Sequence, residues 1–269
     1  MPKDYPLTTF AVMSFIAHLV QSGKKHATIM PYVSAIAFAH KIRGFEDPTS
    51  SFLFSKFLTG LKKSVNINDQ NRLEPITFMM LKEIIALVDT LNDSIFVKIL
   101  IKAVMSLMYH ACLRISEVAP SRMADHAIKS SMVSFSIQAP LNHPSKVTIN
   151  LTTFKHSKAP QVIQVSAIKD KSVCPVRLLW SYHKLKRQSE TYFCDRKSRP
   201  ITRAFVMSRL RQVVRKSSFR GRRVNTHSFR IGRTTDLVLR GGASDAYIRH
   251  VGRWSSNAYL KYIRSIVRL

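Results

Sequence analysis

The chain has 269 residues, more than one average domain, which predicts two domains. Hydrophobic residues make up 45% and charged residues 22%, which is typical of a globular protein and excludes a wholly disordered one. Lys and Arg total 43 against 15 Asp and Glu, a formal net charge of +28. Because such a charge opposes compaction unless an anion neutralises it, we expect a polyanionic partner, usually nucleic acid. Charge alone also fits a solvated basic surface or a ribosomal-type RNA binder.

The cysteines and the hydropathy pattern exclude further classes. Cys112, Cys174 and Cys194 are odd in number and form no C-x-x-C pair, which argues against a disulfide framework and a zinc ribbon. No apolar run reaches the ~18 residues that a membrane span needs, and the first residues lack the apolar core of a signal peptide. We therefore expect an intracellular protein without a membrane partner, nuclear if the source is eukaryotic.

Three amphipathic helices are predicted at the start of the chain. Apolar residues recur at helical spacing from Phe10 to Val20, and Gly23 ends that pattern. The same spacing returns over residues 29–42. An Asp-Pro-Thr-Ser sequence at 47–50 then breaks the chain and caps a third helix that begins near Phe52.

A polar segment separates this helical module from the rest of the chain. Residues 66–74 are polar and Pro75 follows, which is typical of a linker with a boundary near residue 73. We therefore predict one domain over residues 1–72 and a second over residues 73–269.

The second domain combines helices with a small sheet. A helix is predicted over 78–90, and residues 95–109 are apolar on most faces, which predicts a buried core helix. Alternating apolar and polar residues predict three strands of an antiparallel sheet, at 133–137, 147–151 and 161–165. Helical patterns return after Cys174-Pro175, at 182–186, 204–216 and 228–239. The predicted fold class is mainly α with a small antiparallel sheet.

The basic excess is concentrated near the C-terminus. Residues 196–269 contain 19 Lys or Arg against two acidic residues, a net charge of +17. The acidic residues of the whole chain form no convincing cluster, so a magnesium-dependent phosphate chemistry is poorly supported. A metal-free route needs guanidinium groups on the phosphate oxygens, together with a nucleophile and an acid.

Three separated segments supply such groups. Arg114 and Glu117 lie three residues apart and can share a helical face, so the carboxylate could orient the guanidinium. His227 and Arg230 have the same spacing near a helix start, where backbone N–H groups favour an anion. The third segment is Val-Gly-Arg-Trp at 251–254, and a tyrosine, Tyr262, follows it.

Each of these residues also has a plain structural interpretation. Arg114 and Glu117 could form a surface ion pair worth ~0.3 to 0.5 kcal/mol. His227 could cap a helix. Tyr262 could be an ordinary aromatic like Tyr247 or Tyr259.

The three segments together carry a family resemblance. "Arg-x-Ser-Glu" from Arg114, "His-x-x-Arg" from His227 and "Gly-x-Trp…Tyr-Ile-Arg" from Gly252 resemble, in the same order, the signature boxes of the tyrosine recombinase and phage integrase family, which includes lambda integrase and the Cre recombinase. The Gly-Arg-Trp box most resembles recombinases of DIRS-type retrotransposons and cryptons. The separation of 32 positions between Arg230 and Tyr262 also matches the family.

The resemblance implies roles for the matched residues. Arg114 and Arg230 would clamp the scissile phosphate, with Glu117 in support. His227 would contact the phosphate and help to remove the proton of Tyr262, which would be the nucleophile. A free phenol has a pKa near ~10, so a cationic site that favours phenolate is required.

Two roles of the family are less well defined by the matched positions. The family uses a lysine of a β-hairpin to protonate the leaving 5′ oxygen, for which Lys155 is the better match and Lys158 the reserve. Where the family usually has His or Trp after the glycine, this chain has Arg253. Arg253 could donate to the phosphate, Trp254 could pack against the tyrosine, and His250 is a third candidate.

The resemblance implies a two-domain DNA clamp. Residues 1–72 would be a helical, SAM-like core-binding domain, with residues 29–41 as the candidate for major-groove contact. Residues 73–269 would be a mixed α/β catalytic domain. The reaction would be site-specific cleavage and rejoining of double-stranded DNA through a 3′-phosphotyrosine bond, with no metal or other cofactor, by a homotetramer on two duplexes. Seven residues follow Tyr262, where many members carry a further segment that docks on a neighbour, which implies a truncated chain or another mode of assembly.

Two alternative functions share most of these features. A catalytically inactive descendant would bind DNA without cutting it, and the departure at Arg253 is its main support. A type IB topoisomerase-like enzyme would use nearly the same residues as a monomer that relaxes supercoils.

Overall fold

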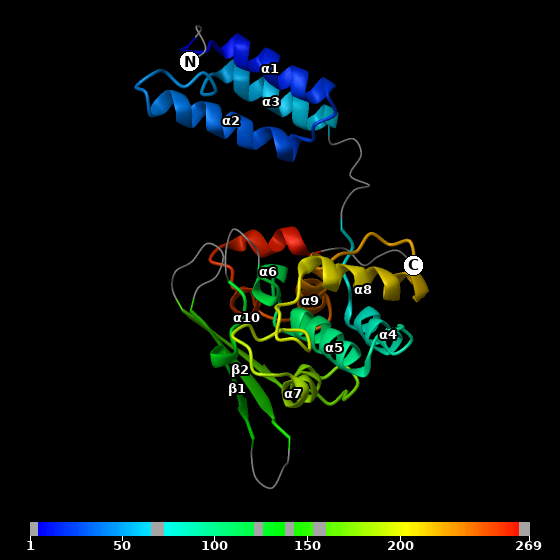
Figure 1. Cartoon of the computed structure of the whole chain (residues 1–269). Helices are drawn as coiled ribbons and strands as arrows, with labels where there is room; N and C mark the ends of the chain where they lie inside the picture. Colours follow the sequence, from blue (N-terminus) through cyan, green and yellow to red (C-terminus); the bar gives the residue numbers. More distant parts are fainter. Residues whose placement is uncertain (1–4, 66–72, 121–125, 138–142, 153–159, 264–269) are drawn as a thin grey trace. The chain divides into compact units, whose positions relative to one another are not determined.

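The structure is a computed structural model that describes residues 5–65, 73–120, 126–137, 143–152 and 160–263. The chain divides into two compact units, Met1–Arg72 and Leu73–Leu269 (Figure 1). Each unit has its own hydrophobic core, so each is described by itself.

The N-terminal unit consists of helices α1 (Thr9–Gln21), α2 (His26–Lys41) and α3 (Phe52–Val65). The Thr8 hydroxyl caps α1 by accepting a hydrogen bond from the Ala11 N–H. The three helices pack around a small set of fully buried apolar side chains: Val12, Ile16, Ile29, Val33 and Phe54. The prediction of three helices is confirmed.

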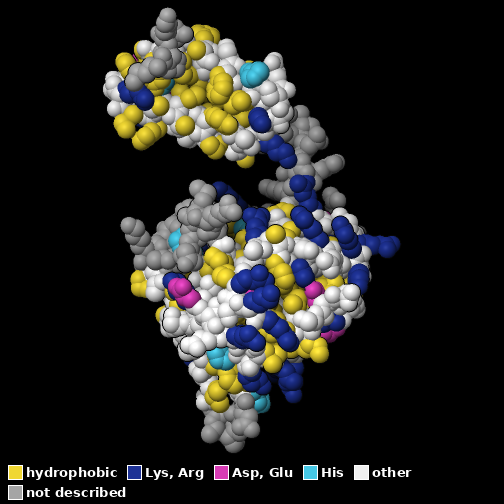
Figure 2. All heavy atoms as spheres, in the orientation of Figure 1, with side chains coloured by type: hydrophobic (Ala, Val, Ile, Leu, Met, Phe, Trp, Pro, Cys, Tyr) yellow, Lys and Arg dark blue, Asp and Glu magenta, His cyan; other side chains and the backbone are white. Residues whose placement is uncertain are grey.

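This unit leaves several large apolar side chains on its surface. Phe10 and Phe52 are 69% and 76% exposed, although both belong to the helical apolar patterns of the sequence. Figure 2 shows apolar side chains gathered over the visible face of this unit. A three-helix unit is too small to bury every apolar residue of its amphipathic helices.

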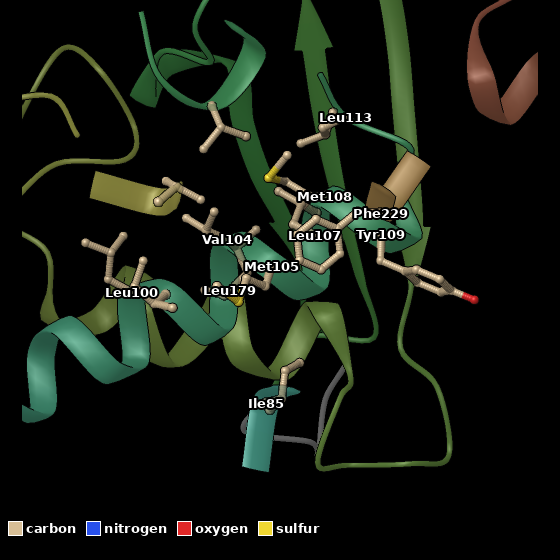
Figure 3. Packing of buried hydrophobic residues seen from close by; sticks show 14 of the residues in the cluster. Ile85, Leu100, Val104, Met105, Leu107, Met108, Tyr109, Leu113, Leu179 and Phe229 are labelled. Carbon is tan, nitrogen blue, oxygen red and sulfur yellow. The ribbon is translucent and has the colours of Figure 1, made fainter. Parts of the chain in front are cut away.

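The second unit is built around helix α5 (Ile95–His110), whose side chains from Ala103 to His110 are all buried. Helices α4 (Phe78–Val88), α7 (Pro175–Leu185) and α9 (His227–Leu239) pack against it. Figure 3 shows α5 side chains in contact with Leu179 of α7 and Phe229 of α9. The predicted core helix is therefore confirmed.

A small antiparallel sheet covers another part of this core. Its strands are β1 (Val133–Ser136), β2 (Lys146–Leu151) and β3 (Gln161–Ser166), in the order β1-β2-β3. In the central strand, Val147 pairs with residues of both neighbours and is fully buried. The predicted sheet is confirmed, because alternating burial along each strand produces the period of two in the sequence.

Five short or peripheral elements complete the second unit in the described residues. They are α6 (Ile115–Val118), η2 (Ser130–Met132), α8 (Arg203–Lys216), α10 (Asp245–Gly252) and η3 (Asn257–Tyr262). Helix α10 buries only Ile248 and Gly252, so it has too few apolar residues for a clear periodic signal.

Helix α9 is held to α4 and α5 by a buried carboxylate. Asp236 accepts hydrogen bonds from the Phe78 N–H at 2.7 Å and from the Tyr109 hydroxyl at 2.5 Å. Gly232 allows the Ile76 backbone to approach closely, because a Cβ at this position would lie 1.7 Å from the Ile76 carbonyl oxygen. These contacts set the position of the residues at the start of α9.

Within the described residues, no helix is both long and apolar enough to cross a membrane. The same part of the chain contains no group of three or more His, Cys, Asp or Glu side chains that could hold a metal ion.

Candidate active site

Arg114 and Glu117 meet directly after the core helix. Cys112 has a positive φ of 47°, which turns the chain out of α5 so that Arg114 becomes the N-cap of α6. The Glu117 carboxylate accepts from the Arg114 N–H at 2.9 Å and from its Nη1 at 3.2 Å. The Glu117 side chain is 1% exposed and the Arg114 side chain 21% exposed, so one face of the Arg114 guanidinium remains accessible.

Arg253 is the second cation on the same carboxylate. Its Nη2 lies 2.6 Å from Glu117 Oε2, and the Arg253 side chain is only 2% exposed. The guanidinium also donates to the carbonyls of Ala111, at 3.0 Å, and Cys112, at 3.3 Å. The two Nη atoms of Arg253 are thus engaged by protein acceptors, while its buried Nε has no hydrogen-bond partner among the described residues. A phosphate contact by Arg253, one of the roles that the sequence left open, stays a prediction.

Arg230 lies in the first turn of α9 and is fully buried. Its Nη1 donates to the Cys112 carbonyl at 2.5 Å, and its Nη2 donates to the Gly252 carbonyl. Burial is the main cause that lowers the pKa of Arg230 to about 10. This value is well above neutral pH, so the group keeps its positive charge. The Arg230 Nε is buried without a hydrogen-bond partner among the described residues.

Tyr262 is the last residue of η3 and its ring is surrounded by candidate residues from other segments. The ring centroid lies 5.2 Å from that of His227 and 5.0 Å from that of Trp254. The Arg230 guanidinium carbon is 5.7 Å from the centre of the Tyr262 ring. The Tyr262 carbonyl accepts from Thr235 Oγ1 of α9 at 3.1 Å, which fixes the end of η3 on that helix.

The three candidates near the Gly-Arg-Trp box have different positions. Trp254 covers Arg230, with 4.3 Å between the guanidinium carbon and the centre of the indole, and it also contacts Tyr262. Arg253 is held by Glu117. His250 is exposed and lines a cavity of about 250 Å³ together with Arg233.

The lysine predicted to protonate the leaving 5′ oxygen has no described position. Lys155 and its reserve Lys158 lie outside the described residues. Their role therefore stays a prediction.

Comparison with known proteins assigns the chain to a family. The model of the phage integrase family matches residues 76–264. The chain belongs to the phage integrase family. Among curated proteins, none matches this family member in sequence.

Solved structures of tyrosine recombinases share the fold. XerH site-specific recombinase bound to palindromic difH substrate has a TM-score of 0.66 at 14% identity, over 96% of this chain and 69% of XerH. The Tn1549 transposon integrase in complex with circular intermediate DNA has a TM-score of 0.66 at 11% identity, over 97% and 82% of the two chains. A lambda integrase dimer bound to a COC' core site has a TM-score of 0.56 at 14% identity, over 98% and 66%.

Backbone acceptors hold the guanidinium groups of this candidate site, and the sequence alone did not predict them. The Cys112 carbonyl accepts from both Arg230 and Arg253, and the Gly252 carbonyl accepts from Arg230. Every residue carries a backbone carbonyl, so neither the type nor the spacing of residues indicates which carbonyls accept these hydrogen bonds. The one sequence feature that points to Cys112 is its position, because it lies between the predicted core helix and Arg114.

Proposed function

We propose that the chain is a site-specific DNA recombinase that cleaves and rejoins strands through a 3′-phosphotyrosine bond to Tyr262. The observation that carries the proposal is the position of the Tyr262 ring beside the Arg230 guanidinium and the His227 ring. Arg230 and His227 lie 32 and 35 positions before Tyr262 in the sequence. One chemical role explains their proximity, whereas separate structural roles would each need their own explanation.

Each residue has a defined part in the proposed step. The Tyr262 Oη attacks phosphorus and gives its proton to His227, while the bond from phosphorus to the 5′ oxygen breaks. Lys155 donates a proton to the leaving 5′ oxygen. Arg114 and Arg230 stabilise the negative charge on the non-bridging oxygens. A 5′ hydroxyl then attacks the phosphotyrosine and reverses the sequence, so neither a metal ion nor an external energy source takes part.

Arg230 has donors left for a phosphate. A guanidinium carries five N–H groups, and two backbone carbonyls engage one each on Nη1 and Nη2. A phosphate oxygen would satisfy the buried Nε, whose isolation otherwise costs about 1–3 kcal/mol. Since Trp254 covers the guanidinium, we propose that its indole shifts when the scissile phosphate binds.

Glu117 and Arg253 would act as positioning residues. Glu117 holds Arg114 through the 3.2 Å contact, and Arg253 balances the second oxygen of the same carboxylate. The shared Cys112 carbonyl links Arg253 to Arg230. Through these contacts, Arg253 would hold both phosphate-binding guanidinium groups in place.

The proposed partner is double-stranded DNA, bound largely through phosphates by the basic residues of the segment 196–269. The relatives described above were solved with DNA, which supports this partner. In the proposal, residues 1–72 bind DNA as a helical core-binding domain and four copies assemble on two duplexes.

A nicked suicide duplex tests the proposal. The nick lies close to the cleavage site, so the released piece that carries the 5′ hydroxyl is short and diffuses away. Religation is then impossible, and an active chain accumulates as a covalent adduct visible on a denaturing gel. Tyr262→Phe should abolish the adduct, whereas Tyr247→Phe, at a half-exposed tyrosine, should keep it.

Other results would point to the alternatives. DNA binding by the parent chain without an adduct on its cognate site would indicate a catalytically inactive descendant. Relaxation of supercoils at concentrations too low for assembly would indicate a topoisomerase IB-like enzyme.

A further inference from the structure

A second basic hollow lies on the outer side of helix α7. Its cavity volume is about 450 Å³, and its lining includes Lys169, Lys171, Arg177, Trp180, Ser181 and Lys184. We call this hollow the α7 groove. Helices α7 and α9 each pack against the core helix α5, and Figure 1 draws them on different sides of it. The α7 groove is therefore separate from the candidate active site on α9.

We propose that the α7 groove binds single-stranded nucleic acid. The first reason is its charge: among the residues that the structure describes, the lining holds four exposed cations, Lys169, Lys171, Arg177 and Lys184, and no acidic side chain. Within the described part of the chain, none of the four forms an ion pair. Unpaired cations in one hollow attract an anion with several phosphates.

The neighbouring acidic residue is already neutralised. Asp170 bonds Lys82 at 2.8 Å and the Ser172 hydroxyl at 2.6 Å. Its charge is therefore balanced locally and does not offset the cations of the α7 groove.

The second reason is an aromatic surface among these cations. Trp180 is half-buried, and His183 stacks on it with 5.4 Å between ring centroids and an angle of 13° between ring planes. Phe135 holds the indole from another side, at 5.0 Å. Lys184 Nζ lies 6.0 Å from the indole centre. A fixed indole beside cations is the arrangement that stacks an unpaired base while its phosphates are neutralised.

The start of α7 adds a third anion-binding feature. Cys174 is the N-cap and lines the groove, but no side chain caps this end of the helix. Pro175 at the first helical position carries no N–H, and the N–H groups that follow it in the first turn have no acceptor within the helix. The partial positive charge of this helix end favours a phosphate in the same place as the cations.

The shape favours a single strand over a duplex or a mononucleotide. Bases of a duplex are stacked on one another and cannot enter a hollow to meet Trp180. An adjoining hollow of about 550 Å³ shares Lys171 and Arg177 with the α7 groove. Its other two cations, Lys82 and Lys102, are paired with Asp170 at 2.8 Å and with Asp89 at 2.6 Å. The shared Lys171 and Arg177 therefore extend the unpaired cations beyond Trp180, so that consecutive phosphates of one strand can be bound where a mononucleotide would contact only some of these cations.

The test measures binding of a single strand while the main DNA site is occupied. The full-length Tyr262→Phe chain is saturated with unlabelled duplex and titrated with a fluorescent oligothymidylate of about 12 nucleotides. The anisotropy should report binding that the duplex does not compete away. Arg177→Ala with Lys184→Ala should weaken it about tenfold or more and reduce the salt slope by about 1.4, because each lost phosphate contact contributes about 0.7.

Two further variants make the result specific. Arg187→Ala with Lys197→Ala removes the same two charges at exposed positions outside the groove lining and should leave binding within about twofold. Trp180→Leu removes the stacking surface and should weaken binding about tenfold, with far-ultraviolet circular dichroism to show that the fold persists. With Tyr262 restored, the groove variants should form the covalent adduct as the parent does, so the groove and the proposed recombinase activity are tested separately.

Several results would overturn the proposal. Displacement of the oligothymidylate by duplex would place it at the main DNA site. Equal weakening by the Arg187 and Lys197 substitutions would show a non-specific charge effect. Competition by ATP at the same nucleotide concentration would indicate a mononucleotide site.

Discussion

Replacement of Arg253 by methionine distinguishes a positioning role from a direct phosphate contact. The Arg253 and Glu117 side chains are 2% and 1% exposed, so the pair is fully buried. Removing one partner of a buried ion pair costs about 3–5 kcal/mol, because the other charge is left uncompensated. Arg114 also contacts Glu117, at 3.2 Å, and its charge is left to compensate the carboxylate after the substitution. We therefore expect the lower end of this range, about 3 kcal/mol.

The loss should be visible in equilibrium unfolding. A destabilisation of about 3 kcal/mol lowers the melting temperature by roughly 6–12 °C for a unit of this size. Glu117→Gln combined with Arg253→Met should cost less than the sum of the single substitutions, because the double variant has no uncompensated carboxylate. Arg249→Met, at a half-buried arginine of helix α10, which ends just before Arg253, is the control and should cost less than about 1 kcal/mol.

Cleavage measurements complete this test. If Arg253 positions Arg114 and Arg230, Arg253→Met should lose adduct formation together with stability, and Arg253→Lys should recover part of both. Normal stability of Arg253→Met, within about 0.5 kcal/mol of the parent, together with a complete loss of cleavage would refute the reasoning. That outcome would assign Arg253 to the scissile phosphate.

Two further predictions concern stability. Burial lowers the pKa of His110 from 6.5 to about 4, so the unfolded chain takes up a proton in this pH window while the folded chain does not. Stability should be full above pH 6.5 and fall by on the order of 3 kcal/mol towards pH 4. Urea unfolding at several pH values checks this, and an equal pH dependence in His110→Gln would contradict it. Gly232→Ala should destabilise by more than about 2 kcal/mol because its Cβ would overlap the Ile76 carbonyl. Gly60→Ala, with open space around its Cβ, should be neutral or stabilising in thermal melts, and equal effects at both glycines would count against the packing argument.

The sequence alone determined the family resemblance, the long helices and the sheet. Helix α5 and strands β1 to β3 could be predicted because their burial repeats with a local period of 3.6 or 2. Helix α10 and η3 were not predicted, since α10 buries few side chains and η3 buries only Tyr259.

The sequence could not decide which residue of the Gly-Arg-Trp segment lies beside Tyr262. Arg253 adopts a left-handed backbone with φ of 57°, which separates the direction of its side chain from that of Trp254. Its guanidinium pairs with Glu117, 136 residues earlier, and Trp254 covers Arg230 and contacts Tyr262. Only the tertiary structure could decide this, because a buried charge is positioned by the acceptor that balances it, and that acceptor comes from a distant part of the chain.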